Sequence, residues 1–240
     1  MTAAAARFAL AVCLPAAAAG QQAIPLPRPV PIQDNSFLIE EAYNQEPGIV
    51  QHINTLLREG GGSWSYSLTQ EWPVSGQRHQ VSFTVPVEHG MGAVAINYRR
   101  QLAGIGGGTA FAPRFSVLLP TAGAGGTAVQ VNLPVSAFIA RDVVTHWNAG
   151  AALERRSATV YSAGASVIWL VRPSVNLMLE LAWTGAAGSG DVVVNPGLRW
   201  AHNLGALQIV PGIAFPDGRD VFLYLSFEHP FRSFEPAPAP

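Results

Sequence analysis

Residues 175–183 read Val-Asn-Leu-Met-Leu-Glu-Leu-Ala-Trp, and a large apolar side chain stands at every odd position of this stretch. A strict period of two is the pattern of a β-strand with one apolar face. The same alternation recurs from about Ser63 to His229, and Gly, Pro, Asp and Asn residues separate the runs. The sequence therefore predicts a sheet built from many strands in succession.

The spacing of the runs predicts about eleven strands, each near the length of about 9–11 residues that a tilted membrane strand needs. Single-chain bacterial barrels have an even number of strands. We therefore expect ten or twelve strands and one misplaced boundary. Pro134, Pro196 and Pro211 fall within the expected strands. Because proline deletes a ladder donor, we expect them at bulges, rims or misplaced strand ends.

The composition indicates what the apolar face meets. Only 12% of the 240 residues are charged, every basic residue is Arg, and the mean hydropathy is +0.23. The opposite face carries small or polar residues, and several Trp residues stand near strand ends, as in an interfacial girdle. Closure would remove the exposed edges of such a sheet. We predict an all-β, antiparallel up-and-down transmembrane β-barrel, with a soluble secreted β-sandwich as the alternative.

Four segments flank the predicted barrel of residues 63–231. Residues 1–20 resemble a signal peptide, and they contain the only cysteine. Residues 21–33 carry a proline at every second position over part of their length, which predicts an extended linker. Residues 34–59 are expected to form an amphipathic helical segment, and residues 232–240 a Pro-rich tail.

The helical prediction for residues 34–59 depends on spacing. Ile49, Val50, Ile53, Leu56 and Leu57 recur at the intervals of one helix face. Pro47-Gly48 interrupts the run, so two short helices with a kink are expected. Such a segment would either plug the inner mouth of the barrel or lie against the membrane surface.

Polar residues that alternate with the apolar face are expected to point into the barrel. Glu180 and Arg199 are the clearest cases, because each lies between large apolar neighbours on adjacent strands. Inside a barrel such charges either form a structural ion pair that fills a narrow lumen or line a pore and select solutes. The full set of lumen or rim candidates is Asn97, Arg99, Arg114, Gln130, Asn132, Glu180 and Arg199.

Motifs for other chemistry are weak. The six histidines lack the spacing of a zinc motif, and the glycine run at 104–108 lacks the Lys-Ser/Thr of a phosphate loop. We therefore expect no metal site, no cofactor and no catalytic residue. Scattered arginines and a net charge of −1 argue against a nucleic-acid partner. A hydrolase with a Ser, a His and an acid stays an alternative, although no particular Ser stands out.

Five stretches of the chain resemble one known family. They are residues 32–46, 70–73, 112–121, 130–134 and 146–150, the first reading Ile-Gln-Asp-Asn-Ser-Phe-Leu-Ile-Glu-Glu-Ala-Tyr-Asn-Gln-Glu. These stretches resemble predicted outer-membrane transporters related to the MetA-pathway of phenol degradation proteins. The resemblance covers most of the chain beyond the signal peptide. It implies a porin-like barrel that transports hydrophobic or aromatic compounds, and it brings no catalytic residues.

Together these patterns predict a non-enzymatic barrel in the outer membrane of a Gram-negative bacterium. Its expected partners are outer-membrane lipid and a small-molecule solute, and its expected role is that of a passive channel or transporter. A non-conducting structural barrel and a hydrolase remain as alternatives. The sequence leaves the solute and the oligomeric state open.

Overall fold

The computed structural model describes residues 36–74, 76–88, 91–105, 108–121 and 126–231. The expected signal peptide, the Pro-rich linker and the Pro-rich tail lie outside the described residues. The strands are β1 Ile49–Arg58, β2 Trp64–Pro73, β3 His79–Val87, β4 Val94–Arg100, β5 Ala110–Phe111, β6 Arg114–Leu119, β7 Ala128–Asn132, β8 Val135–Ala140, β9 Val143–Glu154, β10 Val160–Arg172, β11 Val175–Ala186, β12 Ser189–Trp200, β13 His202–Leu204, β14 Leu207–Ala214 and β15 Val221–Pro230.

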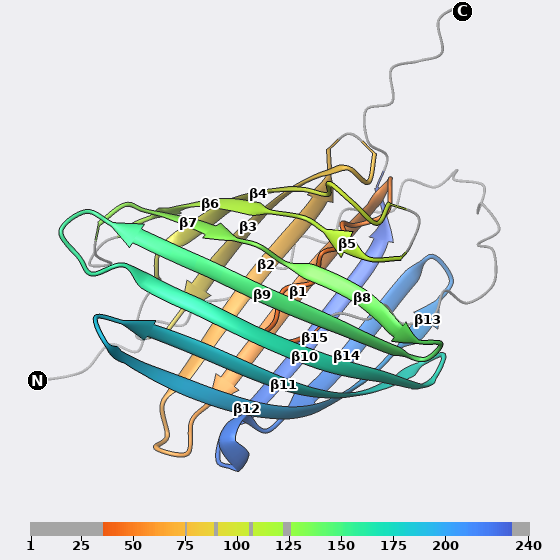
Figure 1. Ribbon diagram of the computed structural model, residues 1–240. Coiled ribbons are helices and arrows are strands. Elements are labelled where there is room, and N and C mark those ends of the chain that lie inside the picture. The colour runs from red at the N-terminus through yellow and green to blue at the C-terminus, as the bar shows by residue number, and fades with distance from the viewer. Residues whose placement is uncertain (1–35, 75, 89–90, 106–107, 122–125, 232–240) are drawn as a thin grey trace, which may run out of the picture.

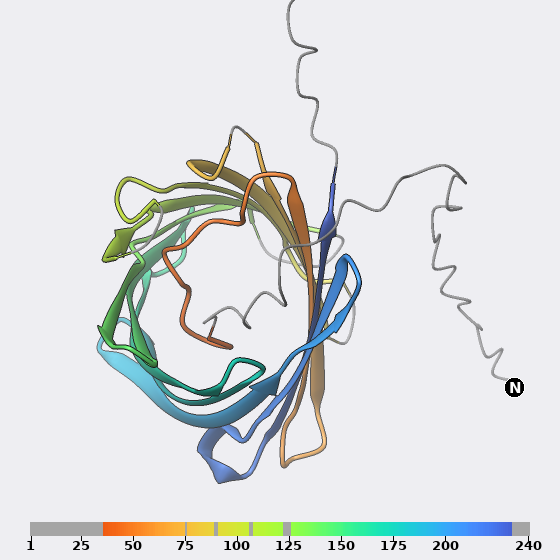
Figure 2. The same ribbon diagram turned by 90° about the vertical axis from the view of Figure 1, so that its right-hand side faces the viewer.

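The strands form one closed antiparallel barrel in which each strand pairs with its neighbours along the chain (Figures 1 and 2). Three barrel strands are interrupted and consist of two pieces each: β5 with β6, β7 with β8, and β12 with β13. The fifteen pieces therefore make twelve barrel strands, which confirms the expected up-and-down barrel and its even strand number. Pro134 lies in the break between β7 and β8, whereas Pro196 and Pro211 lie within β12 and β14.

The helical prediction for residues 49–58 is wrong, because these residues form strand β1. This strand pairs with β15 from Ile49↔Pro230 to Arg58↔Val221 and with β2 on its other side. It is the strand that the expected count of eleven did not include. It closes the barrel, because it satisfies the backbone groups that β2 and β15 would otherwise leave at open edges. Among the described residues, the helical structure consists of a single 3-10 turn, Pro216–Gly218.

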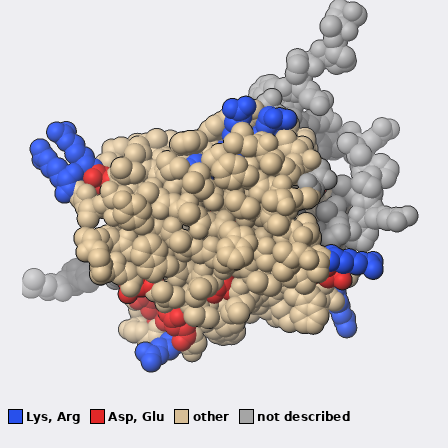
Figure 3. All heavy atoms as spheres, in the orientation of Figure 1, with Lys and Arg blue, Asp and Glu red and all other residues tan. Residues whose placement is uncertain are grey.

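The apolar face of the strands points outward. Along β11, Leu177, Leu179 and Leu181 are 41%, 54% and 51% exposed, whereas Glu180 between them is fully buried. Figure 3 shows an outer face on which uncharged side chains cover the centre and most charged side chains lie near its edges. Among the described residues, no helix is long and apolar enough to cross a bilayer.

The two ends of the barrel differ in what they hold. One end, here called the termini end, contains the first residue of the first strand, Ile49, and the last residue of the last strand, Pro230. These two residues pair with each other. The opposite end, here called the loop end, contains the turn between β1 and β2 and the turn between β11 and β12. In the latter turn Ala187 and Gly188 both adopt positive φ, 49° and 88°. This conformation gives a two-residue hairpin whose twist matches that of the flanking strands.

Candidate functional site

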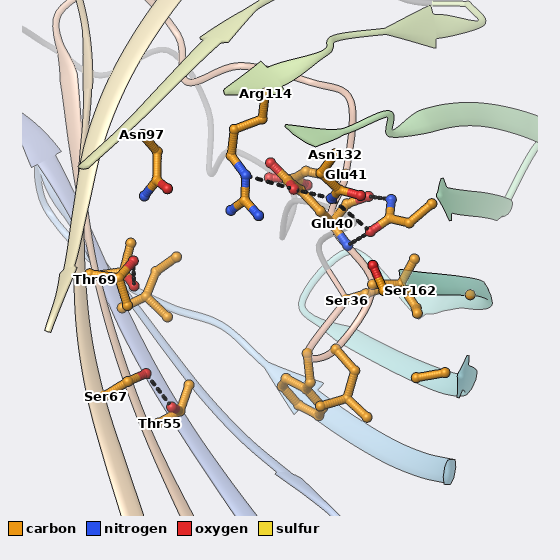
Figure 4. A pocket seen from close by; sticks show the side chains of 18 of the residues that line it. Ser36, Glu40, Glu41, Thr55, Ser67, Thr69, Asn97, Arg114, Asn132 and Ser162 are labelled. Carbon is orange, nitrogen blue, oxygen red and sulfur yellow. Dashed lines mark hydrogen bonds and ion pairs between the residues drawn. The ribbon is translucent and has the colours of Figure 1, made fainter. Parts of the chain in front are cut away.

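The lumen of the barrel contains a cavity of about 470 Å³ (Figure 4). Its walls are inward-facing residues from the loop-end half of the strands, and most of them carry hydroxyl, amide or charged groups. One side of the cavity is formed by Ser36–Glu41, which precede the first strand. The wall residues include Thr55, Ser67, Thr69, Glu71, Ser82, Thr84, Asn97, Arg99, Arg114, Gln130, Asn132, Asn148, Ser162, Thr184, Phe222 and Tyr224.

Residues 36–46, here called the inner segment, lie inside the barrel (Figure 2). Of the two placements expected for the region before β1, the structure shows the inner one for these residues. The segment is not helical and adopts bends instead, so the helical prediction is wrong here as well. Extended backbone has no internal hydrogen-bond partners, and inward-facing side chains of the barrel supply them.

The side chain of Glu180 receives the start of the inner segment. Its Oε1 accepts the backbone N–H groups of Phe37, Leu38 and Ile39 at 2.9, 2.8 and 3.2 Å. Its Oε2 accepts the side-chain amide of Asn195 at 2.7 Å. Successive N–H groups that converge on one anion form a concave anion site. A fully buried carboxylate from β11 thus fixes three residues of the inner segment.

Further along, the inner segment follows the wall from β9 towards β3. The backbone N–H of Glu40 donates to Asn148 Oδ1 at 2.7 Å, and that of Ala42 donates to Ser136 Oγ at 2.8 Å. Asn44 donates to Gln101 Oε1 at 3.0 Å. Residue by residue, amide and hydroxyl side chains of the wall replace the hydrogen bonds that a sheet partner would give.

The ring of Phe37 fits against a part of the wall that lacks side chains. A Cβ atom added at Gly197 or at Gly212 would lie 2.8 or 2.6 Å from this ring. The ring also packs on Phe222 and Tyr224, with centroid distances of 5.4 and 5.1 Å. Two glycines therefore create the space in which the inner segment is anchored by an aromatic side chain.

The candidate Arg199 belongs to this anchor. Its guanidinium lies over the rings of Phe37 and Tyr224, 6.0 and 5.7 Å from their centroids. Antiparallel register places Arg199 opposite Asn176 and places Glu180 opposite Asn195. Both candidates are buried in the lumen, as alternation predicted, but they lie beneath the inner segment and are not part of the cavity lining.

The other five candidates line the cavity: Asn97, Arg99, Arg114, Gln130 and Asn132. Arg99 and Arg114 form ion pairs with Glu40 of the inner segment, at 3.4 and 3.3 Å. The sequence interpretation did not identify Glu40 as a lumen residue. Glu40 lies in the longest stretch of the family resemblance, but that stretch was expected to be helical. Helical spacing does not show which of its residues faces the lumen.

The lumen towards the termini end is filled with side chains. Gln45 donates its amide to Gln51 Oε1, and Gln51 in turn donates to Glu228 at 2.8 Å. Gln101 and His146 are fully buried at the same side of the inner segment. The cavity described above lies mainly on the loop-end side of these packed side chains.

The structure contains a Ser–His pair that the sequence did not single out. Ser136 Oγ lies 2.6 Å from His146 Nδ1. Both residues are fully buried, and the hydroxyl also accepts the N–H of Ala42. A nucleophile must be reachable by its substrate. The pair therefore supports the inner segment and gives no support to the hydrolase alternative.

Two histidines meet on the wall near the termini end. His52 Nε2 and His229 Nε2 are 3.1 Å apart, and Gln70 bonds the other nitrogen of His52. Sequence spacing could not show this, because 177 residues separate the two histidines. Among the described residues, no group of three or more His, Cys, Asp or Glu side chains could hold a metal ion.

Comparison with known proteins gives the fold a context. No family model matches the chain, and no curated protein matches it in sequence. The KdgM porin is similar with a TM-score of 0.60 at 10% identity, over 76% of this chain and 99% of that porin. A second structure of it, in complex with disordered oligogalacturonate, gives 0.57 at 8% identity over 76% and 99%. The NanC porin gives 0.55 at 8% identity over 77% and 100%.

The chain has the barrel fold of the KdgM and NanC porins. The similarity extends over nearly the whole length of those porins, and the closed barrel with an apolar exterior agrees with it. At these identities the similarity concerns the fold alone. The resemblance to the phenol-degradation family therefore stays a proposal.

Proposed function

We propose that this protein is a passive channel or transporter for small solutes in the outer membrane of a Gram-negative bacterium. One observation carries the proposal: a polar cavity of about 470 Å³ lies inside a barrel whose outer face is apolar. An apolar exterior suits acyl chains, whereas a polar interior that holds water suits a solute. The similarity to porins supports the same role, and one of those porins is described with an oligogalacturonate.

The chemistry of the wall favours solutes that are soluble in water. Hydroxyl, amide and charged side chains dominate the lining. Polar groups of this kind lose their water when an apolar molecule displaces it, and that loss is unfavourable. The hydrophobic or aromatic solute that the family resemblance implies remains the second candidate. Phe37 and Phe222, which also line the cavity, are the observation in its favour.

We propose further that passage requires the inner segment to move. In the described conformation this segment and the packed side chains beside it fill the half of the lumen towards the termini end. Residues 36–46 are held by hydrogen bonds and small apolar contacts, and such contacts can exchange with water. If the segment never moves, the protein is a non-conducting structural barrel.

A reversible disulfide separates the two possibilities. Ser36 Oγ and Ser166 Oγ are 2.6 Å apart, so cysteines at these two positions bring two sulfur atoms together between the inner segment and β10. We expect the oxidised S36C/S166C protein to give no single-channel conductance in planar bilayers, and the reduced protein to conduct like wild type. The two single variants control for the substitutions. Wild-type protein that is folded and gives neither conductance nor solute flux would contradict the proposed function.

A further inference from the structure

The carboxylate of Glu40 is held by three side chains of the barrel wall. Arg99 Nη1 lies 3.4 Å from Oε1, and Arg114 Nε lies 3.3 Å from Oε2. Asn132 donates its amide to Oε2 as well. Figure 4 shows Arg114 and Asn132 directed towards Glu40 at the edge of the cavity. Two guanidinium groups and an amide around one carboxylate are the usual elements of a carboxylate-binding site in proteins.

The two arginines have different environments. Arg99 is nearly buried, and it also donates to Asn44 Oδ1 and to the carbonyl oxygens of Glu41 and Tyr43 at 2.7–2.9 Å. It therefore holds the backbone of the inner segment. The side chain of Arg114 is 24% exposed, and that of Glu40 is 16% exposed. The rest of the Arg114 side chain thus faces the cavity, whereas its Nε is buried against Glu40.

The ion pairs between Glu40 and the arginines are long compared with strong charge-assisted hydrogen bonds, which are about 2.7–2.9 Å. The two arginine contacts are 3.4 and 3.3 Å long, while Asn132 holds Oε2 closely. The Glu40 carboxylate is part of the chain, so it cannot adjust its position as the carboxylate of a free solute can. The contact is therefore one that a solute can replace.

The net formal charge of the cavity lining is negative when the inner segment is counted and positive when it is not. The acidic and basic side chains that line the cavity are Arg99, Arg114, Glu40, Glu41 and Glu71, whose formal charges sum to minus one. Glu40 and Glu41 belong to the inner segment. Without them the wall carries plus one. A cavity with low-dielectric walls enhances the effect of such a charge on an entering ion.

We propose that Arg99, Arg114 and Asn132 form a binding site for a solute carboxylate, which Glu40 occupies in the closed state. A carboxylate-bearing solute takes the place of Glu40 and frees the inner segment at this point. The proposal rests on the proposed function, because it names the solute class of the same cavity. It predicts that the protein discriminates an acid from a neutral molecule of the same size.

Galacturonate and galactose are suitable probes, because they differ in one carboxylate. Their binding to the detergent-solubilised full-length protein is measured by calorimetry. Glu40→Gln removes the internal competitor, so we expect it to raise the affinity for galacturonate about tenfold, as expected when a competing closed state is removed. Galactose should bind weakly to wild type and variant alike. Arg114→Gln combined with Glu40→Gln should abolish the gain.

Glu71→Gln is the matched control. Glu71 lines the same cavity, and its substitution removes the same charge, but the ion pairs of Arg99 and Arg114 are with Glu40. We expect its effect on galacturonate affinity to stay below about twofold, because Glu71 does not occupy the place that the solute carboxylate would take. The mobility of each variant in cold detergent shows whether its barrel is folded.

Three outcomes would overturn the carboxylate site. They are equal effects of Glu40→Gln and Glu71→Gln, equal binding of galactose and galacturonate, and equal binding of inorganic phosphate, which would indicate general attraction of anions. Binding is measured without transport, so the two proposals fail separately. Selective binding by a protein that never conducts would contradict only the channel. Conductance without selective binding would contradict only the site.

Discussion

Glu180 is the side chain that holds the start of the inner segment, through three successive backbone N–H groups. Hydrogen bonds to a charged acceptor contribute about 1.5–3 kcal/mol each, and those between neutral groups about half as much. Glu180→Gln keeps the shape and removes the charge on which three N–H groups converge. We expect the free energy of local opening at residues 37–39 to fall by at least about 2 kcal/mol. Hydrogen–deuterium exchange of that peptide measures it.

The control for Glu180→Gln is Asn195→Ala, which removes the amide that donates to the other carboxylate oxygen. It leaves the charge and the three backbone contacts in place, so exchange at residues 37–39 should change much less. Equal exchange rates in wild type and Glu180→Gln would show that the carboxylate does not hold the inner segment.

At this scale the sequence predicted which way side chains point, but not what they touch. Alternation with Leu179 and Leu181 placed Glu180 in the lumen, and the structure agrees. Its partner depends on strand register, which places Asn195 and not Arg199 opposite it. Register follows from the turn. The turn between the two strands is rich in glycine, and counting outward from its centre in the sequence gives a partner close to Asn195.

Strand β1 shows why an element can carry a misleading pattern. Ile53 and Leu57 point inward and pack against the apolar cluster that contains Phe222 and Tyr224. His52 and Asn54 alternate with them and bond to neighbouring strands instead. Leu56 lies on the same face as His52 and Asn54, so apolar residues occur on both faces of β1 and together imitate helical spacing. Only the partner strands, which are distant in sequence, decide between the two periods.

The closure of the barrel by β1 gives a prediction for this element. Leu56 lies within the strand, two residues from its end, opposite Tyr66 on β2 and Leu223 on β15. Leu56→Pro removes a ladder donor between two paired neighbours, so we expect loss of the folded barrel. Leu56→Ala at the same position keeps the donor and should fold. Heat-modifiable mobility in a detergent gel distinguishes them, and a folded Leu56→Pro barrel would show that β1 does not close it.

The inner segment gives a second prediction at the scale of elements. A side chain at Gly212 would collide with the Phe37 ring, because its Cβ would lie 2.6 Å from Cζ. We expect Gly212→Val to expel the ring, expose residues 36–46 to proteolysis and increase the open fraction of the channel. Gly61→Val is the control, because a Cβ there meets nothing within 4 Å. Protection of residues 36–46 unchanged in Gly212→Val would show that the aromatic anchor is not required.

For the whole molecule, the sequence was sufficient for the class of fold because its signal is distributed over many strands. Each inward residue has outward apolar neighbours, so errors in single boundaries leave the conclusion unchanged. The lumen could not be predicted in the same way. Its contents depend on residues 36–46, whose backbone groups contact five strands, β3, β4, β8, β9 and β11. Every residue except proline has a backbone N–H, so the residue types do not show which of these groups makes a contact.

The last prediction tests whether the outer face meets lipid, and it uses two exposed leucines at different depths. Leu179 lies in the middle of β11, and Leu204 ends the short strand β13 at the termini end; they are 54% and 63% exposed. In a bilayer an arginine costs about 2–4 kcal/mol at the midplane and about 0–1 near the interface. We therefore expect Leu179→Arg to lower the unfolding free energy in lipid vesicles by about that larger amount, and Leu204→Arg to change it little. In water both substitutions would put a charge on an exposed surface at almost no cost. Equal small effects at the two positions would mean that the apolar face does not lie in a membrane.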